Sequence, residues 1–226
     1  MSYHYDLDFI RARYNRLAAI YPLFEVILIL PSGIRARAVQ RLELKQGDRV
    51  LEVGCGTGRN LPHLQKAVGP AGHIYGIDYC EGMLTKARQL CERQQWRNVS
   101  LSHQDAAQMS VPEPVDGVLF SLCYTVMPEP RQALKRAWEY LRPNKHTVIM
   151  DGKLAPGLLG RLSRPFVMLA SKATVLGDLD EQPWEDLKEW TSRIEVEEVN
   201  WGTYYICRGT KTDSRGRGGA PGRVNG

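Results

Sequence analysis

Three alternating glycines, Gly54, Gly56 and Gly58, constrain this chain more than any other feature of its sequence. They directly follow a short β-rich run at 49–53 and precede a helical run, so they form the turn between a strand and a helix. Glycine permits a tight turn there and lets backbone N–H groups approach a ligand closely. A dinucleotide-binding loop would need a further glycine where this chain has Arg59. The loop therefore need not hold a pyrophosphate, and it can approach an uncharged nucleoside or an amino-acid moiety.

Strand-like and helical runs alternate along the chain after this loop. The expected strands are 49–53, 73–77, 99–103, 115–122 and 147–150, and the expected helices are 61–68, 83–94 and 131–141. Two later runs, 195–199 and 203–208, are expected to be closing strands. Alternation at this short spacing favours a mostly parallel, doubly wound α/β sheet of seven strands, with helices on both faces.

The other segments predict additions to a single domain that spans residues 1–211. A chain of 226 residues is long enough to bury a sizeable core. The runs 8–21 and 24–42 predict an N-terminal helical lid, because apolar residues recur at helical spacing in the first of them. Residues 154–190 interrupt the alternation and predict a helical insertion. Residues 212–226 are rich in Gly and Arg without apolar periodicity, which predicts a disordered tail.

Polar residues stand at or near the carboxyl ends of five expected strands. They are Glu52, Asp78, Asp105, Ser121 and Asp151. Because the ends of parallel strands meet at one edge of a sheet, where such folds bind their ligands, we expect a cleft at this edge. Asp78 follows the glycine loop by about twenty residues, the place from which a carboxylate accepts the hydroxyl groups of a ribose. The alternative is an aspartate that only caps its strand.

Three segments resemble the motifs of class I S-adenosylmethionine-dependent methyltransferases. Residues 50–61, Val-Leu-Glu-Val-Gly-Cys-Gly-Thr-Gly-Arg-Asn-Leu, resemble the first motif of that family. Residues 75–84, in which an acid precedes a Met-Leu pair, resemble its second block, and residues 104–106 resemble its adenine-contacting motif. The resemblance covers roughly residues 8–151. It implies a Rossmann-like fold and S-adenosyl-L-methionine as the cofactor.

The same resemblance implies roles for individual residues of the chain. Gly54, Cys55, Gly56 and Gly58 belong to the loop that lines the methionine part of the cofactor, and Glu52 supports that loop near the amino group. Asp78 takes the ribose, Tyr79 and Met83 flank the adenine, Asp105 and Ala106 meet its exocyclic amine, and Ser121 lies near the methionine end. Tyr21 either closes over the carboxylate or packs in the core. The chain departs from the family pattern at Tyr79-Cys80, where many members carry a small residue and then serine.

Composition argues against several other functions. The net charge is +5, with much of the excess near the carboxyl terminus and no dense basic patch, so we expect no nucleic-acid partner. The five cysteines are odd in number and lack C-x-x-C spacing, which disfavours a disulfide framework or a zinc site and favours a reducing compartment. The histidines form no metal-binding motif, so we expect no metal. No signal peptide is visible, and we expect a cytoplasmic protein.

The motifs leave the methyl acceptor, a small molecule or a lipid, undecided. The segment 59–61 makes the chain similar to bacterial phospholipid and betaine-lipid N-methyltransferases and, less closely, to ubiquinone/menaquinone C-methyltransferases. N-methylation of a lipid or small amine is the first expectation, and Tyr14, Tyr124 and Tyr204 are candidates to face the acceptor. C-methylation of a quinone precursor is the second. Transfer of the cofactor's aminocarboxypropyl arm and a binding protein without catalysis remain as rivals.

The insertion offers one further indication about the acceptor. Within 158–173, Arg161 and Arg164 lie with Lys172 on one side of a helical projection, opposite the Leu and Phe positions. A basic amphipathic stretch of this kind can rest on an anionic membrane, which predicts peripheral membrane contact. The alternative is an ordinary lid helix that packs its apolar face on the domain.

Overall fold

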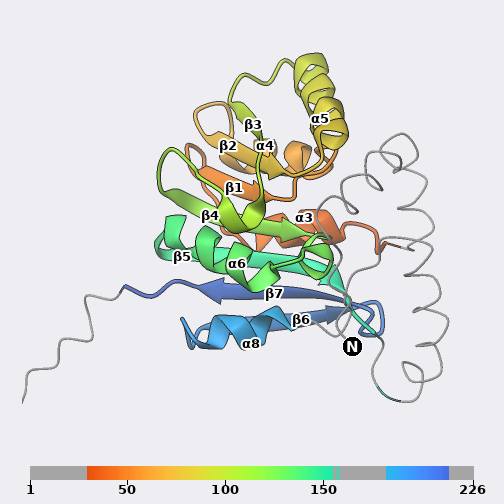
Figure 1. The fold of residues 1–226 in the computed structure, drawn as a ribbon, viewed down its shortest axis with the longest axis vertical. Coiled ribbons are helices and arrows are strands. Elements are labelled where there is room, and N and C mark those ends of the chain that lie inside the picture. Colours follow the sequence, from red (N-terminus) through yellow and green to blue (C-terminus); the bar gives the residue numbers. More distant parts are fainter. Residues whose placement is uncertain (1–29, 155–156, 158–181, 214–226) are drawn as a thin grey trace, which may run out of the picture.

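A seven-stranded sheet organises the protein, and Figure 1 shows its strands running across the molecule. The computed structural model describes residues 30–154, 157 and 182–213. The strand order is β3-β2-β1-β4-β5-β7-β6. The strands are β1 (Arg49–Val53), β2 (His73–Asp78), β3 (Val99–His103), β4 (Val115–Ser121), β5 (Leu141–Gly152), β6 (Ile194–Val199) and β7 (Tyr204–Thr210). The first five pair in parallel, and β7 pairs antiparallel with β5 and β6. The mostly parallel, Rossmann-like sheet expected from the sequence is confirmed.

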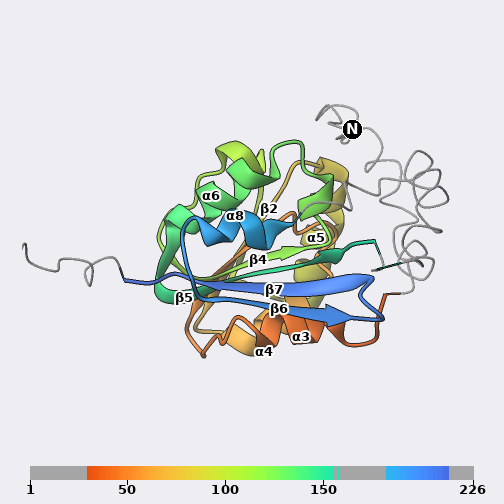
Figure 2. The ribbon, with the colours of Figure 1, turned by 90° about the horizontal axis from the view of Figure 1, so that it is seen from below.

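Helices cover both faces of this sheet, as Figure 2 shows. One face carries α3 (Ile34–Gln40), α4 (Leu61–Val68) and α5 (Glu81–Gln94), most of whose buried residues share one apolar cluster. The other carries α6 (Pro130–Tyr140) and α8 (Pro183–Lys188), whose buried residues share a second cluster. Two short 3-10 helices, η1 (Ala106–Gln108) and η2 (Tyr124–Val126), follow β3 and β4.

The central strand β4 shows why the sheet needs a layer of helices on each face. Every residue of Val115–Ser121 is buried. A strand that is buried along its whole length must be covered on both faces, as in doubly wound folds. The alternating helices supply that cover, and they leave the carboxyl edge of the strands to the loops.

The structure differs from the sequence expectation at the start of β5. The strand begins at Leu141 rather than at residue 147, because the register against β4 shifts between Val115 and Gly117. That shift admits residues 142–145, Arg-Pro-Asn-Lys, which by composition indicate a turn. Arg142 donates two hydrogen bonds of 2.9 Å to Asp116, so the irregular stretch is held by a buried carboxylate at the edge opposite the cleft.

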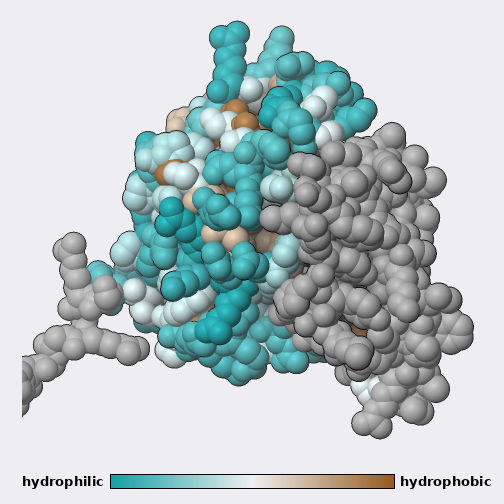
Figure 3. Space-filling view, in the orientation of Figure 1, coloured by the Kyte–Doolittle hydropathy of each residue, from teal (hydrophilic) through white to brown (hydrophobic). Residues whose placement is uncertain are grey.

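Several expectations concern residues outside the described part of the chain. The N-terminal lid falls within 1–29, apart from α3, which begins after Gly33. The amphipathic stretch 158–173 and most of the predicted tail also lie outside it, so membrane contact and disorder there stay predictions. Among the described residues, no helix is long and apolar enough to cross a bilayer. On the side seen in Figure 3, hydrophobic residues of the described surface appear only as small, separate spots.

Candidate functional site

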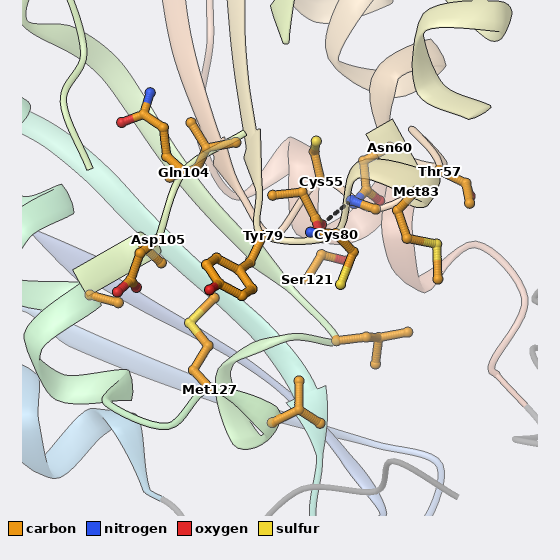
Figure 4. Close-up of a pocket in the computed structure, with 18 of the residues that line it drawn as sticks. Cys55, Thr57, Asn60, Tyr79, Cys80, Met83, Gln104, Asp105, Ser121 and Met127 are labelled. Atoms are coloured by element: carbon orange, nitrogen blue, oxygen red, sulfur yellow. Dashed lines mark hydrogen bonds between the residues drawn. The ribbon is translucent and has the colours of Figure 1, made fainter. Parts of the chain in front are cut away.

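A pocket opens at the carboxyl edge of the parallel strands, between the loops that follow β1, β2, β3 and β4 (Figure 4). Its lining includes these residues assigned to the cofactor from the sequence: Gly54, Cys55, Gly56, Asp78, Tyr79, Met83, Asp105, Ala106 and Ser121. Glu52 and Gly58 are buried just behind the lining. Tyr21 lies outside the described residues. The chain therefore brings most of the assigned residues, which are far apart in sequence, to one cavity.

The glycines of the loop meet different constraints. A Cβ built on Gly54 would lie 2.7 Å from Cβ of Cys123, and one on Gly58 would lie 2.8 Å from a methyl of Leu61. A Cβ on Gly56 would meet nothing within 4 Å, although this residue also lines the pocket. Packing thus excludes side chains at the first and third glycines, whereas the space above Gly56 is open for a ligand. This open space fits the cofactor that the motif implies.

Asp78 ties the glycine loop to the second strand. Its Oδ2 accepts a hydrogen bond of 2.8 Å from the backbone N–H of Gly56, and its Oδ1 accepts one of 2.8 Å from that of Cys80. Burial raises the pKa of this carboxyl, and the two backbone donors oppose the rise. Asp78 therefore fixes the loop and also presents a carboxylate to the cavity, in the position suited to ribose hydroxyls.

A chain of hydrogen bonds crosses the end of the pocket beside the glycine loop. Nη1 of Arg35 donates to Oδ1 of Asn60 at 3.2 Å and to Oγ of Ser121 at 3.1 Å. Nδ2 of Asn60 donates to Oε1 of Glu52 at 2.7 Å. Oε2 of Glu52 is buried without a hydrogen-bond partner among the residues described here. An unpaired buried carboxylate oxygen is costly, and the amino group of a bound cofactor would supply the missing donor.

The electrostatics of Glu52 follow from the same arrangement. Burial raises the pKa of this carboxyl to about 7, while the hydrogen bond from Asn60 and the positive charge of Arg35 lower it and nearby Asp78 raises it further. Glu52 is completely buried, so solvent does not stabilise its charge. The Glu52 carboxyl therefore has a pKa near neutral pH, and a cationic ligand beside it would favour the ionised form.

Arg35 and Asn60 are site residues that sequence reasoning missed. Asn60 was part of the quoted motif, so its place after the glycines could have identified it. Arg35 gave no such signal, because it stands in a run with Arg37 and Arg41 that resembles an ordinary charged helix surface. The fold separates the three, since Arg37 and Arg41 form ion pairs with Glu197 while Arg35 lines the pocket.

The far end of the pocket is built from the loops after β2 and β3. Tyr79, Met83, Asp105 and Ala106 line it, as the adenine assignment requires. Oδ1 of Asp105 accepts a hydrogen bond of 2.9 Å from the N–H of Ala107, so this carboxylate also caps η1. One carboxylate oxygen thus serves the fold, and the second is the one suited to an exocyclic amine.

The structure places two of the acceptor-facing tyrosines elsewhere. Tyr124 is fully buried, and its hydroxyl donates to Oδ2 of Asp186 at 2.8 Å, beneath the pocket wall. Tyr204 packs in the apolar cluster on the α3 side and does not line the pocket. Both side chains point into the core because their strand and loop positions face the two helical layers. The third candidate, Tyr14, lies outside the described residues.

Asp151, another carboxylate at the end of a strand, does not line the pocket, although the sequence predicted it at the cleft. It is buried, and it accepts hydrogen bonds from the backbone N–H of Thr125 at 3.2 Å and from its Oγ1 at 3.3 Å. Burial raises its pKa to about 6, opposed by backbone N–H donors from Gly152, Thr125 and Tyr124. Asp151 therefore anchors the loop after β4, which in turn carries the pocket wall.

That wall contains a backbone conformation that is uncommon for a bulky residue. Leu122 follows β4 with φ of 56°, in the left-handed region. Its N–H donates to the carbonyl of Met150 at 2.8 Å, which fixes the turn. The turn brings Leu122, Val126 and Met127 to the cavity, so this side of the pocket is mainly apolar, with Glu129 as its charged residue. Among the described residues, no group of three or more His, Cys, Asp or Glu side chains could hold a metal ion.

Comparison with known proteins gives a match to one family model and similarity to several proteins. Residues 50–144 match the family model described as a methyltransferase domain. The chain is 26% identical to a demethylmenaquinone methyltransferase of Geobacillus kaustophilus, over 82% of this chain and 83% of that protein. It is 34% identical to a protein-L-isoaspartate O-methyltransferase of Methanothrix thermoacetophila, over 52% of this chain and about half, 54%, of that protein.

Solved structures show the same fold. A SAM-dependent methyltransferase from Aquifex aeolicus superposes with a TM-score of 0.57 at 24% identity, covering 83% of this chain and 96% of that one. At this identity the likeness concerns the fold alone.

Replacing Asp78 by asparagine should weaken binding of S-adenosylhomocysteine by about 1.5–3 kcal/mol, because a charged acceptor of hydrogen bonds is lost. Isothermal titration calorimetry measures this effect. Asp116→Asn is the matched control, since Asp116 is a buried carboxylate paired with Arg142 at the opposite edge of the sheet. It should lower stability and leave cofactor affinity unchanged. Equal affinity of Asp78→Asn and wild type would mean that Asp78 only braces the loop.

Replacing Gly56 by alanine should abolish most cofactor binding, because the methyl group enters the open space beside the loop. Gly47→Ala is the control, since Gly47 also has a positive φ and open surroundings but lies in the turn before β1. Both variants should lose about 1–2 kcal/mol of stability from the left-handed backbone. Thermal melts with and without S-adenosylhomocysteine separate the two effects. Normal ligand stabilisation of Gly56→Ala would contradict the placement.

Replacing Glu52 by glutamine should flatten the pH dependence of stability. The folded pKa of about 7 exceeds the ordinary 4.5, so the folded state keeps a proton that the unfolded chain releases. This contribution is complete below pH 4.5 and is lost as the pH rises through 7, at a cost of about 3 kcal/mol. Urea unfolding at pH 5.5 and 8 should show a larger loss for wild type than for Glu52→Gln. Parallel losses in both proteins would overturn the assignment, since Asp151 is common to both.

Proposed function

Since this chain is a class I S-adenosylmethionine-dependent methyltransferase, its function is decided by its methyl acceptor, and we propose that this acceptor is a ring carbon of a reduced naphthoquinone. Among the acceptors expected from the sequence, this was the second, after an amine. Two observations support the change of order, one from the related proteins and one from the pocket wall.

The related proteins support a quinone acceptor. The match to the demethylmenaquinone methyltransferase of Geobacillus kaustophilus extends over 82% of this chain, well beyond the cofactor motifs at 50–61 and 75–84. A relative from Geobacillus stearothermophilus with the same name is 28% identical over 73% of this chain. Cofactor motifs alone are shared by methyltransferases of every kind, so likeness over the longer span is the part that bears on the acceptor.

The apolar wall of the pocket supports the same acceptor. A methylated ammonium product is best held by aromatic faces, through cation–π attraction. Of the aromatic side chains in 30–154 and 182–213, the pocket has only Tyr79, which lies at the adenine end. The wall of Leu122, Val126 and Met127 instead suits a flat, apolar ring. This wall is the observation that carries the proposal on the structural side.

Methyl transfer to a ring carbon requires few charged side chains at this wall of the pocket. When bound, the cofactor supplies an electrophilic methyl group on a sulfonium. The ring carbon forms the new bond to that methyl, and the bond from sulfur breaks with its electron pair left on sulfur. The ring proton passes to solvent as aromaticity returns. The protein must hold the ring in line with the methyl group and exclude water. Leu122 and Met127 line the pocket and would do both, and Asp151 holds the loop that carries them.

The test supplies isotopically labelled S-adenosylmethionine with one of two acceptors in vesicles, a reduced naphthoquinone that lacks the ring methyl or phosphatidylethanolamine. We expect label on the ring carbon and S-adenosylhomocysteine as the nucleoside product, both measured by mass spectrometry. Met127→Ala should raise the KM for the quinol, and Asp78→Asn should slow the reaction through the cofactor. Label on nitrogen would restore the amine acceptor, and methylthioadenosine as product would indicate transfer of the aminocarboxypropyl arm.

A further inference from the structure

Arg35 reaches the cofactor pocket from a segment that the family motif does not include. It lies in the first turn of α3, ahead of the matched residues 50–144. Nη1 of Arg35 donates to Asn60, which follows the glycine loop, and to Ser121, at the end of β4. The guanidinium is thereby fixed between two pieces of the pocket lining. A long side chain that is held at both sides loses little further freedom when it binds a ligand.

The rest of α3 shows that this placement is particular to Arg35. Arg37 and Arg41 stand four residues apart, and so share one face of the helix, where both pair with Glu197 of β6. Arg35 points from another side of the same helix, toward the carboxyl edge of the sheet. The helix therefore places two arginines on a structural ion pair and one at the ligand cavity.

The charges at this end of the pocket match an amino acid in its zwitterionic form. The amide of Asn60 accepts from Arg35 through Oδ1 and donates to Glu52 through Nδ2. A positive and a negative group thus lie on either side of one amide. Oε2 of Glu52, which has no hydrogen-bond partner in 30–154 or 182–213, suits an ammonium group. A guanidinium is the side chain that best matches the geometry of a carboxylate.

We propose that Arg35 binds the α-carboxylate of the methionine arm, and that it makes the pocket select S-adenosyl amino acids over thionucleosides that lack this arm. From the sequence, Tyr21 either closes over this carboxylate or packs in the core, and it lies outside the described residues. Arg59 is the other arginine that lines the pocket, but it is exposed, whereas Arg35 is partly buried. The inference rests on the cofactor and not on the identity of the acceptor, so it stands or falls separately from the quinone proposal.

The experiment compares two ligands on the same protein by isothermal titration calorimetry. S-adenosylhomocysteine carries the amino-acid arm, whereas 5′-methylthioadenosine has the same nucleoside without it. Arg35→Ala should weaken S-adenosylhomocysteine binding about 10- to 100-fold, the effect of losing charged hydrogen bonds, and should change methylthioadenosine binding by less than about twofold. Arg35→Lys, which keeps the charge and loses the planar fork, should fall between wild type and Arg35→Ala.

Two matched variants make the result specific. Arg37→Ala removes the same charge from the same helix and should change neither affinity, because Arg37 pairs with Glu197. Arg59→Ala removes the other pocket arginine and should affect S-adenosylhomocysteine much less than Arg35→Ala does. Because both ligands are titrated into one preparation, partial unfolding lowers the number of sites and leaves the ratio of the two affinities unchanged.

Three outcomes would overturn the proposal. Equal weakening of both ligands by Arg35→Ala would show that the residue only supports the loop through Asn60 and Ser121. No weakening of either would remove it from the site. A loss of S-adenosylhomocysteine affinity that is larger in Arg59→Ala than in Arg35→Ala, with methylthioadenosine binding unchanged, would assign the carboxylate to Arg59 of the glycine loop instead.

Discussion

The hydrogen bond from the N–H of Gly56 to the carboxylate of Asp78 is the interaction on which this site depends. It joins the loop after β1 to the end of β2, and a second bond from Cys80 holds the same carboxylate in place. One acid therefore shapes the cavity and offers it a charge. The parallel sheet makes this possible, because neighbouring strands deliver their carboxyl ends to one edge. The open space above Gly56 is the direct result.

The carboxylates around the cavity serve two purposes, stability of the fold and binding of a ligand. Asp151 and Asp105 accept hydrogen bonds from nearby loops and fix the wall after β4 and the turn after β3. Glu52 keeps one buried oxygen without a partner in the described structure, and its pKa lies near 7. A group that is costly to bury unpaired is typical of a binding site, where the ligand removes the cost. The unpaired oxygen lowers the stability of the fold, and a ligand that donates a hydrogen bond to it would restore that stability.

The cofactor end and the acceptor end of the pocket are built in different ways. Hydrogen bonds from backbone and side chains fix the cofactor end, and these belong to the motif and its neighbours at 50–61 and 75–84. The acceptor end is an apolar wall shaped by the left-handed turn at Leu122 and by its bond to Met150. Polar motifs can be recognised in a sequence because few residue types perform their chemistry. An apolar wall can be made from many residue types, so its sequence carries little information about the acceptor.

The sequence by itself determined the alternation of strands and helices, the glycine loop and Asp78, because periodicity and turn residues act over short stretches of chain. Most of the residues that it assigned to the cofactor also line the pocket. Only the tertiary structure decided that Arg35, not Arg37 or Arg41, faces the cavity, since the choice depends on how α3 packs against β4 and β6. Only the tertiary structure places the Tyr124 side chain in the core, where its hydroxyl donates a hydrogen bond to Asp186 of α8, 62 residues away in sequence. Contacts between distant segments are set by packing, and no local pattern encodes them.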